Sequence, residues 1–180
     1  LDKQTLINLY PCLPAHFDIL LHLLGALAKS TGGFGLSSGI KVVQDILVGS
    51  TNEHIAIANQ PIGWLASTVT IYDALRKDIE KGAPSLYQSV QKAIDQYPNS
   101  KIHQEVAKTV CVLHVLGNLP ITTQNISGLM QSSIDTSLNV EEIKKAVNDL
   151  ISNQFIPFGE KEGSFCFFSI TKLPYIPICS

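Results

Sequence analysis

The sequence lacks an apolar run long enough to cross a lipid bilayer, which takes roughly 18 consecutive apolar residues. Its longest candidate, residues 17–28, is interrupted by Asp18 and His22. The chain also lacks an excess of basic residues, because its formal net charge is −2. Strong nonspecific attraction to nucleic-acid phosphates requires a basic surface. We therefore expect no membrane partner, and no strong nonspecific binding to nucleic acid by this chain alone.

Closely spaced metal ligands are missing too. The four cysteines lie far apart and form no C-x-x-C pair, so they predict neither a zinc site nor a thioredoxin-like site. His16 and His22 are six residues apart, which is not a ligand spacing. Cys111 and Cys166 fall within apolar patterns, which indicates reduced core residues and favours a cytoplasmic location. We predict no bound metal.

The nucleotide-binding signature of a P-loop is absent as well. Residues 30–39 form a glycine-rich stretch, but the chain contains no G-K-[ST] sequence, so it has no Walker A element. We read the stretch as a connection between two helices. We predict no catalytic residue, and no cofactor bound by this segment alone.

Apolar residues, at 45% of 180, suffice for one large or two small cores. Their spacing in the first half predicts an all-helical bundle over residues 1–98. Ser85 is the expected N-cap of its last helix, and Pro98-Asn99-Ser100 ends that helix. The predicted helices cover residues 15–28, 38–48, 68–81 and 85–97.

The second half has a different order of elements, over residues 99–180. A helix over 103–116 is closed by the C-cap pair Gly117-Asn118, and a short helix over 125–131 follows with Thr123 as its N-cap. A third helix runs from about Asn139, its expected cap, to Asn153. The order then ends in a β-hairpin, and this order is typical of a winged-helix domain.

The hairpin is expected from two apolar runs, residues 155–158 and 164–170, with a polar loop over 160–163 between them. Alternation places Phe165 and Phe167 towards the core and Phe168 outwards. The fold class predicted for the whole chain is therefore mainly α, a helical lid-like bundle followed by a winged helix with a C-terminal hairpin.

The third helix and the wing carry the candidate contact residues. Basic and amide side chains there could reach phosphate or base edges. Acidic side chains on the same helix and wing would repel phosphate, so we favour contact with a protein over contact with DNA. The candidate residues are Lys144, Lys145, Asn148 and Lys161; the acidic residues set against them are Glu141, Glu142, Asp149, Glu160 and Glu162.

Two stretches carry a family resemblance. Residues 10–21 read Y-P-C-L-P-A-H-F-D-I-L-L, and after the glycine-rich gap residues 40–47 read I-K-V-V-Q-D-I-L. Together they resemble large prokaryotic P-loop ATPases of the BREX phage-defence type. In that family these stretches belong to the AAA+ helical lid that follows the nucleotide-binding core, and a winged helix follows through a helical connector. The resemblance covers most of the chain.

The resemblance implies that the parent protein binds ATP and Mg²⁺, and that its ATPase core lies upstream in the same chain. The chain begins at Leu1, and we expect it to be a piece of a longer protein. Other defence-system proteins and double-stranded DNA are the partners that the resemblance suggests. Related ATPases commonly place an arginine just before the second lid helix, where it can reach the γ-phosphate. Here the matching pair is Ser37-Ser38, which leaves open whether this segment contacts nucleotide.

The leading interpretation is a non-catalytic C-terminal segment of such an ATPase, which couples nucleotide state to binding of a partner protein or DNA through its winged helix. The alternative is a free-standing winged-helix transcription regulator with an N-terminal helical sensor or dimerisation module. An enzyme in its own right is the third interpretation, and no motif favours it.

Overall fold

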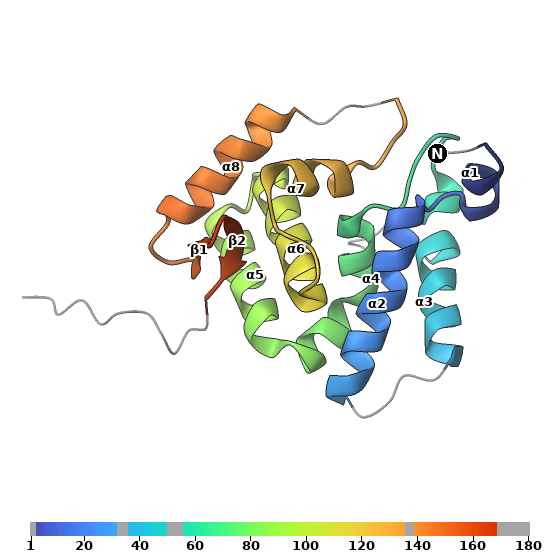
Figure 1. Cartoon of the computed structure of the whole chain (residues 1–180), viewed down its shortest axis with the longest axis horizontal. Helices are drawn as coiled ribbons and strands as arrows, with labels where there is room; N and C mark the ends of the chain where they lie inside the picture. Colours follow the sequence, from blue (N-terminus) through green and yellow to red (C-terminus); the bar gives the residue numbers. More distant parts are fainter. Residues whose placement is uncertain (1–2, 32–35, 50–55, 136–138, 169–180) are drawn as a thin grey trace, which may run out of the picture.

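The computed structural model describes residues 3–31, 36–49, 56–135 and 139–168 (Figure 1). Over this part the chain is mainly helical, with one antiparallel hairpin near its C-terminal end, which confirms the predicted class at that level. The helices are α1 (Lys3–Leu9), α2 (Pro14–Thr31), α3 (Leu36–Val48), α4 (Thr68–Gly82), α5 (Pro84–Gln96), α6 (Lys101–Leu116), α7 (Thr123–Met130) and α8 (Val140–Ser152), with a 3-10 turn at Ile57–Asn59; the strands are β1 (Phe158–Lys161) and β2 (Ser164–Phe167).

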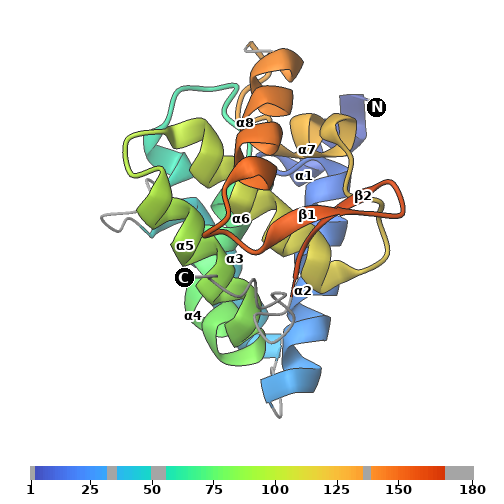
Figure 2. The same ribbon diagram turned by 90° about the vertical axis from the view of Figure 1, so that its left-hand side faces the viewer.

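Helix α6 lies at the centre of the fold (Figures 1 and 2). It packs against α2, α4 and α5 of the first half, and against α7, α8 and β2 of the second. One cluster of buried apolar side chains runs through both halves. The boundary expected near Pro98 falls in the short turn between α5 and α6. The buried residues of α6 are Val106, Ala107, Thr109, Val110, Cys111, Val112 and Leu113.

The helices of the first half form where apolar spacing predicted them, with changes at their ends. Helix α5 begins at Pro84, with Ala83 as its N-cap, so the expected cap at Ser85 is wrong. Proline suits the first helical position because its fixed φ is helical and its missing N–H would be unpaired there anyway. Residues 3–9, which carried no prediction of their own, form the helix α1.

The C-terminal end of α7 is held by side chains from the first half. The last carbonyls of a helix have no intrahelical partner. The carbonyl of Leu129 lies 3.0 Å from Nε2 of His16 and accepts the Thr68 hydroxyl at 2.9 Å. Thr68 in turn lies 2.9 Å from the hydroxyl of Thr109 on α6. Three buried polar side chains from α2, α4 and α6 therefore fix the position of α7.

Several local signals of the second half are confirmed. Gly117 ends α6 in the left-handed conformation, with φ of 67°. The Asn139 side chain caps α8 by accepting the N–H of Glu141 at 3.1 Å. The N-cap of α7 is Thr122, whose hydroxyl accepts the N–H of Asn125, and not Thr123 as expected.

The hairpin is present, but the bounds of its first strand and of its turn differ from the prediction. The first strand begins at Phe158 and includes Glu160 and Lys161, which we expected in a loop. The turn consists of only Glu162 and Gly163, with φ of 54° and 76°. Two successive positive φ values give a tight turn whose twist matches that of the strands, so the polar residues before it can pair as a strand.

Of the phenylalanines expected in the hairpin, Phe155 and Phe168 lie outside its strands. Phe155 lies before the strand and is 62% exposed. Phe167 is buried, Phe165 is half-buried against the core and Phe168 is 40% exposed, as the alternation predicted. The predicted strand end at residues 169–170 lies outside the described residues.

A third segment extends along β2. The N–H of Phe165 donates to the carbonyl of Ile121 at 2.9 Å, and the N–H of Ile121 donates to the Ser164 hydroxyl at 2.9 Å. The chain between α6 and α7 therefore lies beside the hairpin and ties it to the helices.

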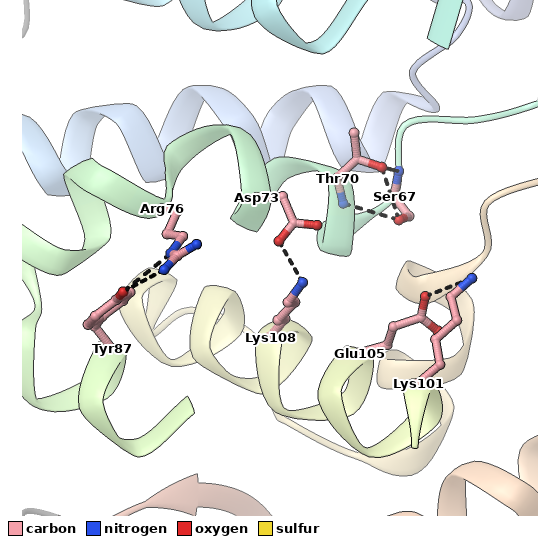
Figure 3. A network of polar contacts seen from close by, with 8 residues as sticks. All are labelled: Ser67, Thr70, Asp73, Arg76, Tyr87, Lys101, Glu105 and Lys108. Atoms are coloured by element: carbon pink, nitrogen blue, oxygen red, sulfur yellow. Dashed lines mark hydrogen bonds and ion pairs between the residues drawn. The ribbon is translucent and has the colours of Figure 1, made fainter. Parts of the chain in front are cut away.

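An ion pair joins the two halves across the α4–α6 interface. Lys108 Nζ lies 2.6 Å from Asp73 Oδ1, and the two side chains are only 16% and 9% exposed (Figure 3). Arg76 on α4 contacts the Tyr87 hydroxyl on α5 at 3.1–3.2 Å in the same region. These contacts are directional, so they fix how α4, α5 and α6 meet.

No helix of the described ranges is both long and apolar enough to cross a membrane.

Replacing Lys108 by methionine should lower the free energy of unfolding by about 1.5–3 kcal/mol, because it removes a charged hydrogen-bond partner from the largely buried Asp73 carboxylate. Urea denaturation measures the change. Lys101→Met removes the same charge from the same helix at a side chain that is 85% exposed, and it should leave stability nearly unchanged. Equal effects of the two variants would contradict the role given to the ion pair.

Replacing Glu162 by asparagine should raise the free energy of unfolding by about 0.5–1 kcal/mol, because asparagine tolerates positive φ better than glutamate does. Thermal denaturation measures the change. Glu160→Asn removes the same charge within β1, where φ is extended, and should give no such gain. A higher free energy of unfolding in both variants would show that the loss of negative charge, and not the turn conformation, is the cause.

Candidate functional site

Helix α8 lies at the surface with one face free (Figure 2). Its inner face, which packs on α6 and α7, consists of Ile143, Ala146, Val147 and Leu150, all buried. The predicted contact residues Lys144, Lys145 and Asn148 are all exposed on its outer face. Their position follows from the helical period, because an apolar stripe that packs inwards leaves the intervening residues in solvent.

The fourth predicted residue, Lys161, is exposed at the end of β1, next to the hairpin turn. Strand β1 contacts α8, and the hairpin lies near the C-terminal end of that helix (Figure 1). The structure therefore places the predicted residues on two elements in contact, with Lys161 at the far end of its strand.

The charges on this surface are balanced. Two lysines on the outer face of α8 stand beside Glu141 and Glu142, and Lys161 stands between Glu160 and Glu162. Asp149 contributes to this surface as well, since 40% of its side chain is exposed, but its carboxylate also bonds to His103 on α6. A mixed surface of this kind does not provide the positive field that attracts phosphate.

The side chain of Asn153, at the C-terminal end of α8, bonds to neighbouring residues of the chain. Its side-chain oxygen accepts the N–H of Phe155 at 3.0 Å, and its side-chain nitrogen lies 3.5 Å from the Tyr97 hydroxyl. It therefore shapes the chain between α8 and β1, and it is half-buried.

Apolar side chains are exposed where α8 meets the hairpin. Ile151 on α8 is 38% exposed, and Phe155 and Phe168 are 62% and 40% exposed. Phe155 lies two residues before Pro157, whose carbonyl accepts the N–H of Phe168 at 2.7 Å. Exposed aromatic side chains at one end of a free helix face favour contact with a protein surface.

A polar cluster that the sequence reasoning missed lies behind α8. The imidazole of His103 lies between the Ser100 hydroxyl, 2.6 Å from Nδ1, and the Asp149 carboxylate, 3.1 Å from Nε2. The Tyr97 ring stacks on it at 4.1 Å between centroids, and its hydroxyl donates to the Asp149 carbonyl at 3.1 Å. We call these four residues the His103 cluster. Ser100 and His103 are close in sequence, but no local signal points to Asp149.

An apolar cavity of about 250 Å³ lies between α1, α2 and α3. Cys12 lies on its wall, and burial raises the pKa of this thiol, so it is not a reactive thiolate. The lining residues are Asn8, Leu9, Tyr10, Pro11, Cys12, Phe17, Leu20, Val43, Ile46 and Leu47.

Residues 35–39 read Gly-Leu-Ser-Ser-Gly and match the G-x-S-x-G pattern, a match that the sequence reasoning overlooked. In hydrolases this pattern joins a strand to a helix. Here the described chain before residues 32–35 is helix α2, so the required context is missing. The side chains of the Ser37-Ser38 pair lie outside the described residues, as does the prediction about nucleotide contact that depended on them.

Within the described ranges, no group of three or more histidine, cysteine or acidic residues is arranged to hold a metal. Cys12, Cys111 and Cys166 carry free thiols, and Cys179 lies outside those ranges. Cys111 is buried, as predicted, and burial raises its pKa to about 12. Cys166, predicted in the core, is only half-buried.

Comparisons with protein-family models, with curated proteins and with solved structures find no match for this chain.

Two histidines make the fold sensitive to acid. His16 is fully buried, and Nδ1 of both His16 and His114 is buried with no hydrogen-bond partner. Burial lowers the pKa of both, and for His16 the bond to the Leu129 carbonyl opposes the shift only in part. The unfolded chain therefore takes up protons first as the pH falls below the ordinary value of 6.5.

We expect the free energy of unfolding to fall as the pH drops from about 6.5 towards 5. His16→Gln should make this fall smaller, because glutamine can keep the donor to Leu129 but takes up no proton. Urea denaturation across this range measures the slope, with the exposed His22→Gln as control. An unchanged slope in His16→Gln would show that this imidazole is not the acid-sensitive group.

Proposed function

We propose that this chain is a non-catalytic segment of a multidomain P-loop ATPase, in which a lid-like helical bundle carries a winged helix that binds a partner. The outer face of α8 and the hairpin beside it form the contact surface. The observation that carries the proposal is the outer face of α8, whose Lys144, Lys145 and Asn148 are exposed while its inner face packs on α6 and α7.

The arrangement around α6 supports a winged helix. Helices α6, α7 and α8 pack on one another, the hairpin contacts α8 and α6, and the segment at Ile121 pairs with β2. A segment between the first two helices that bonds to the hairpin is consistent with this type of domain.

Coupling between the halves has a physical basis in shared contacts. Thr68 and His16 of the bundle hold the end of α7, and Asp73 holds Lys108 of α6. A displacement of α2 or α4 would therefore move α7 and, through it, α8, because packed helices shift as units. In the proposed parent, ATP and Mg²⁺ bound by the upstream core would supply that displacement.

The parent itself is proposed from the resemblance of residues 10–21 and 40–47 to BREX-type ATPases. The balanced charge of α8 and the exposed Ile151 and Phe155 favour another protein of the defence system as the partner, ahead of double-stranded DNA. The full reading frame tests the parent directly. A G-x-x-x-x-G-K-[ST] sequence upstream of these residues supports it, and a short frame that starts near Leu1 removes it.

The transcription regulator is the second candidate, and the cavity between α1, α2 and α3 favours it. An apolar cavity of about 250 Å³ in the N-terminal module could hold the small ligand that a sensor needs. This function requires DNA binding by α8, so a measurement of DNA binding distinguishes the two candidates.

A fluorescently labelled duplex should show no saturable binding below about 10 µM protein at about 50 mM salt, because the contact surface has no excess of positive charge. Fluorescence anisotropy measures the binding. Lys144→Glu combined with Lys145→Glu should leave the titration unchanged, as should Lys77→Glu combined with Lys81→Glu on α4. Tight binding that only the α8 pair of substitutions abolishes would support the regulator instead.

A further inference from the structure

His103 differs from the other described histidines in having an adaptable partner at each ring nitrogen. Its side chain is only 12% exposed, and it lies between the Ser100 hydroxyl and the Asp149 carboxylate. In contrast, Nδ1 of His16 and of His114 has no partner. Protonation of His16 or His114 would leave the Nδ1–H group buried without an acceptor. Both N–H groups of a protonated His103 would have an acceptor, the Ser100 hydroxyl and the Asp149 carboxylate.

The Ser100 hydroxyl suits both protonation states. When Nε2 of neutral His103 donates to Asp149, Nδ1 is an acceptor and Ser100 donates to it. When the imidazole is protonated, Nδ1–H becomes a donor and the same hydroxyl oxygen accepts. Rotation of one hydroxyl hydrogen is enough, so proton uptake breaks no hydrogen bond.

Proton uptake strengthens the contact with α8. An imidazolium–carboxylate hydrogen bond is stronger than one from a neutral imidazole. Asp149 is the acidic group that faces His103 from α8, and Tyr97 is the titratable group that faces it from the end of α5. On α6 itself, Lys101 and Glu105 pair with each other at 3.5 Å.

Tyr97 provides a second contact to Asp149 of α8. Its hydroxyl donates to the backbone carbonyl of Asp149, so the same residue of α8 is held by its side chain and by its main chain. His103 and Tyr97 lie on either side of the short turn between α5 and α6, where Gln104 bonds to the carbonyls of Tyr97 and Pro98 at 2.9 and 3.0 Å. The cluster therefore joins the α5–α6 turn to the last turn of α8.

We propose that the His103 cluster is a protonation-dependent latch that regulates the contact surface by holding α8 more firmly on α6 in its protonated state. Its effect on partner binding rests on the proposed function of α8, whereas the latch itself does not. Acidification then has two opposite effects. Protonation of His16 and His114 destabilises the fold as a whole, whereas protonation of His103 holds α8 more firmly.

Native-state hydrogen exchange of the whole chain tests the latch without any partner. The protection factors of the α8 amides, divided by those of α4 to remove the change in global stability, should be about two- to fivefold higher at about pH 5.5 than at about pH 7.5. Asp149→Asn keeps an acceptor for Nε2–H but removes the charge, so the ratio should no longer depend on pH. Asp95→Asn, at an exposed position on α5, is the matched control and should behave as the wild type.

Two outcomes would overturn the latch. One is an α8/α4 ratio that does not rise on acidification in the wild type. The other is the same rise in Asp149→Asn as in Asp95→Asn. Should Asp149→Asn fail to fold, Ser100→Ala removes the partner of Nδ1 from the other side of the ring and should also reduce the rise; no reduction would equally reject the proposal. Failure of partner or DNA binding would leave these results unchanged, so the two proposals fail separately.

Discussion

The burial of α6 on nearly all of its sides is the constraint on which the rest of the structure depends. Seven residues between Val106 and Leu113 are fully buried. A helix that is apolar almost all round is stable in water only when other elements cover each side. Here α2, α4 and α5 cover it from one half, and α7, α8 and the hairpin from the other. Neither half can be completed without α6, so the position of the contact helix is set by the same contacts that hold the bundle.

Apolar packing on α6 does not by itself fix how its neighbours are oriented, since hydrophobic attraction has little directionality. Polar contacts at the interfaces supply the direction. The Leu129 carbonyl fixes α7, the Asp73–Lys108 pair fixes α4, and the His103 cluster fixes α8. Buried ion pairs and networks add little net stability compared with apolar residues, but removing one partner is costly. In this chain their contribution is to hold helices that would otherwise slide over a common apolar surface.

The sequence predicted what depends on neighbouring residues and missed what depends on distant ones. The Asn139 cap, the Gly117 end of α6 and the inner face of α8 all follow from local spacing, and the structure agrees. The bounds of the first strand and of the loop were wrong because the loop was read from polarity, whereas a two-residue turn with positive φ lets Glu160 pair with Phe165. The bond between Asp149 and His103 was missed because the two residues lie 46 positions apart. The long-range pairing of Ile121 with β2 carried no local signal either. The contact residues were placed correctly on exposed positions, and their partner is still a proposal.

The most direct test of this account is whether the chain unfolds in one step. NMR signals of Leu23 on α2 and Leu75 on α4, both fully buried, report on the first half, and those of Ala146 and Val147 report on α8 in the second. Because α6 belongs to the core of both halves, we predict that the two probes give the same urea midpoint and the same slope. An α8 transition at clearly lower urea, with the Leu23 and Leu75 signals still native, would show that the second half is held independently of the first and would contradict the shared core.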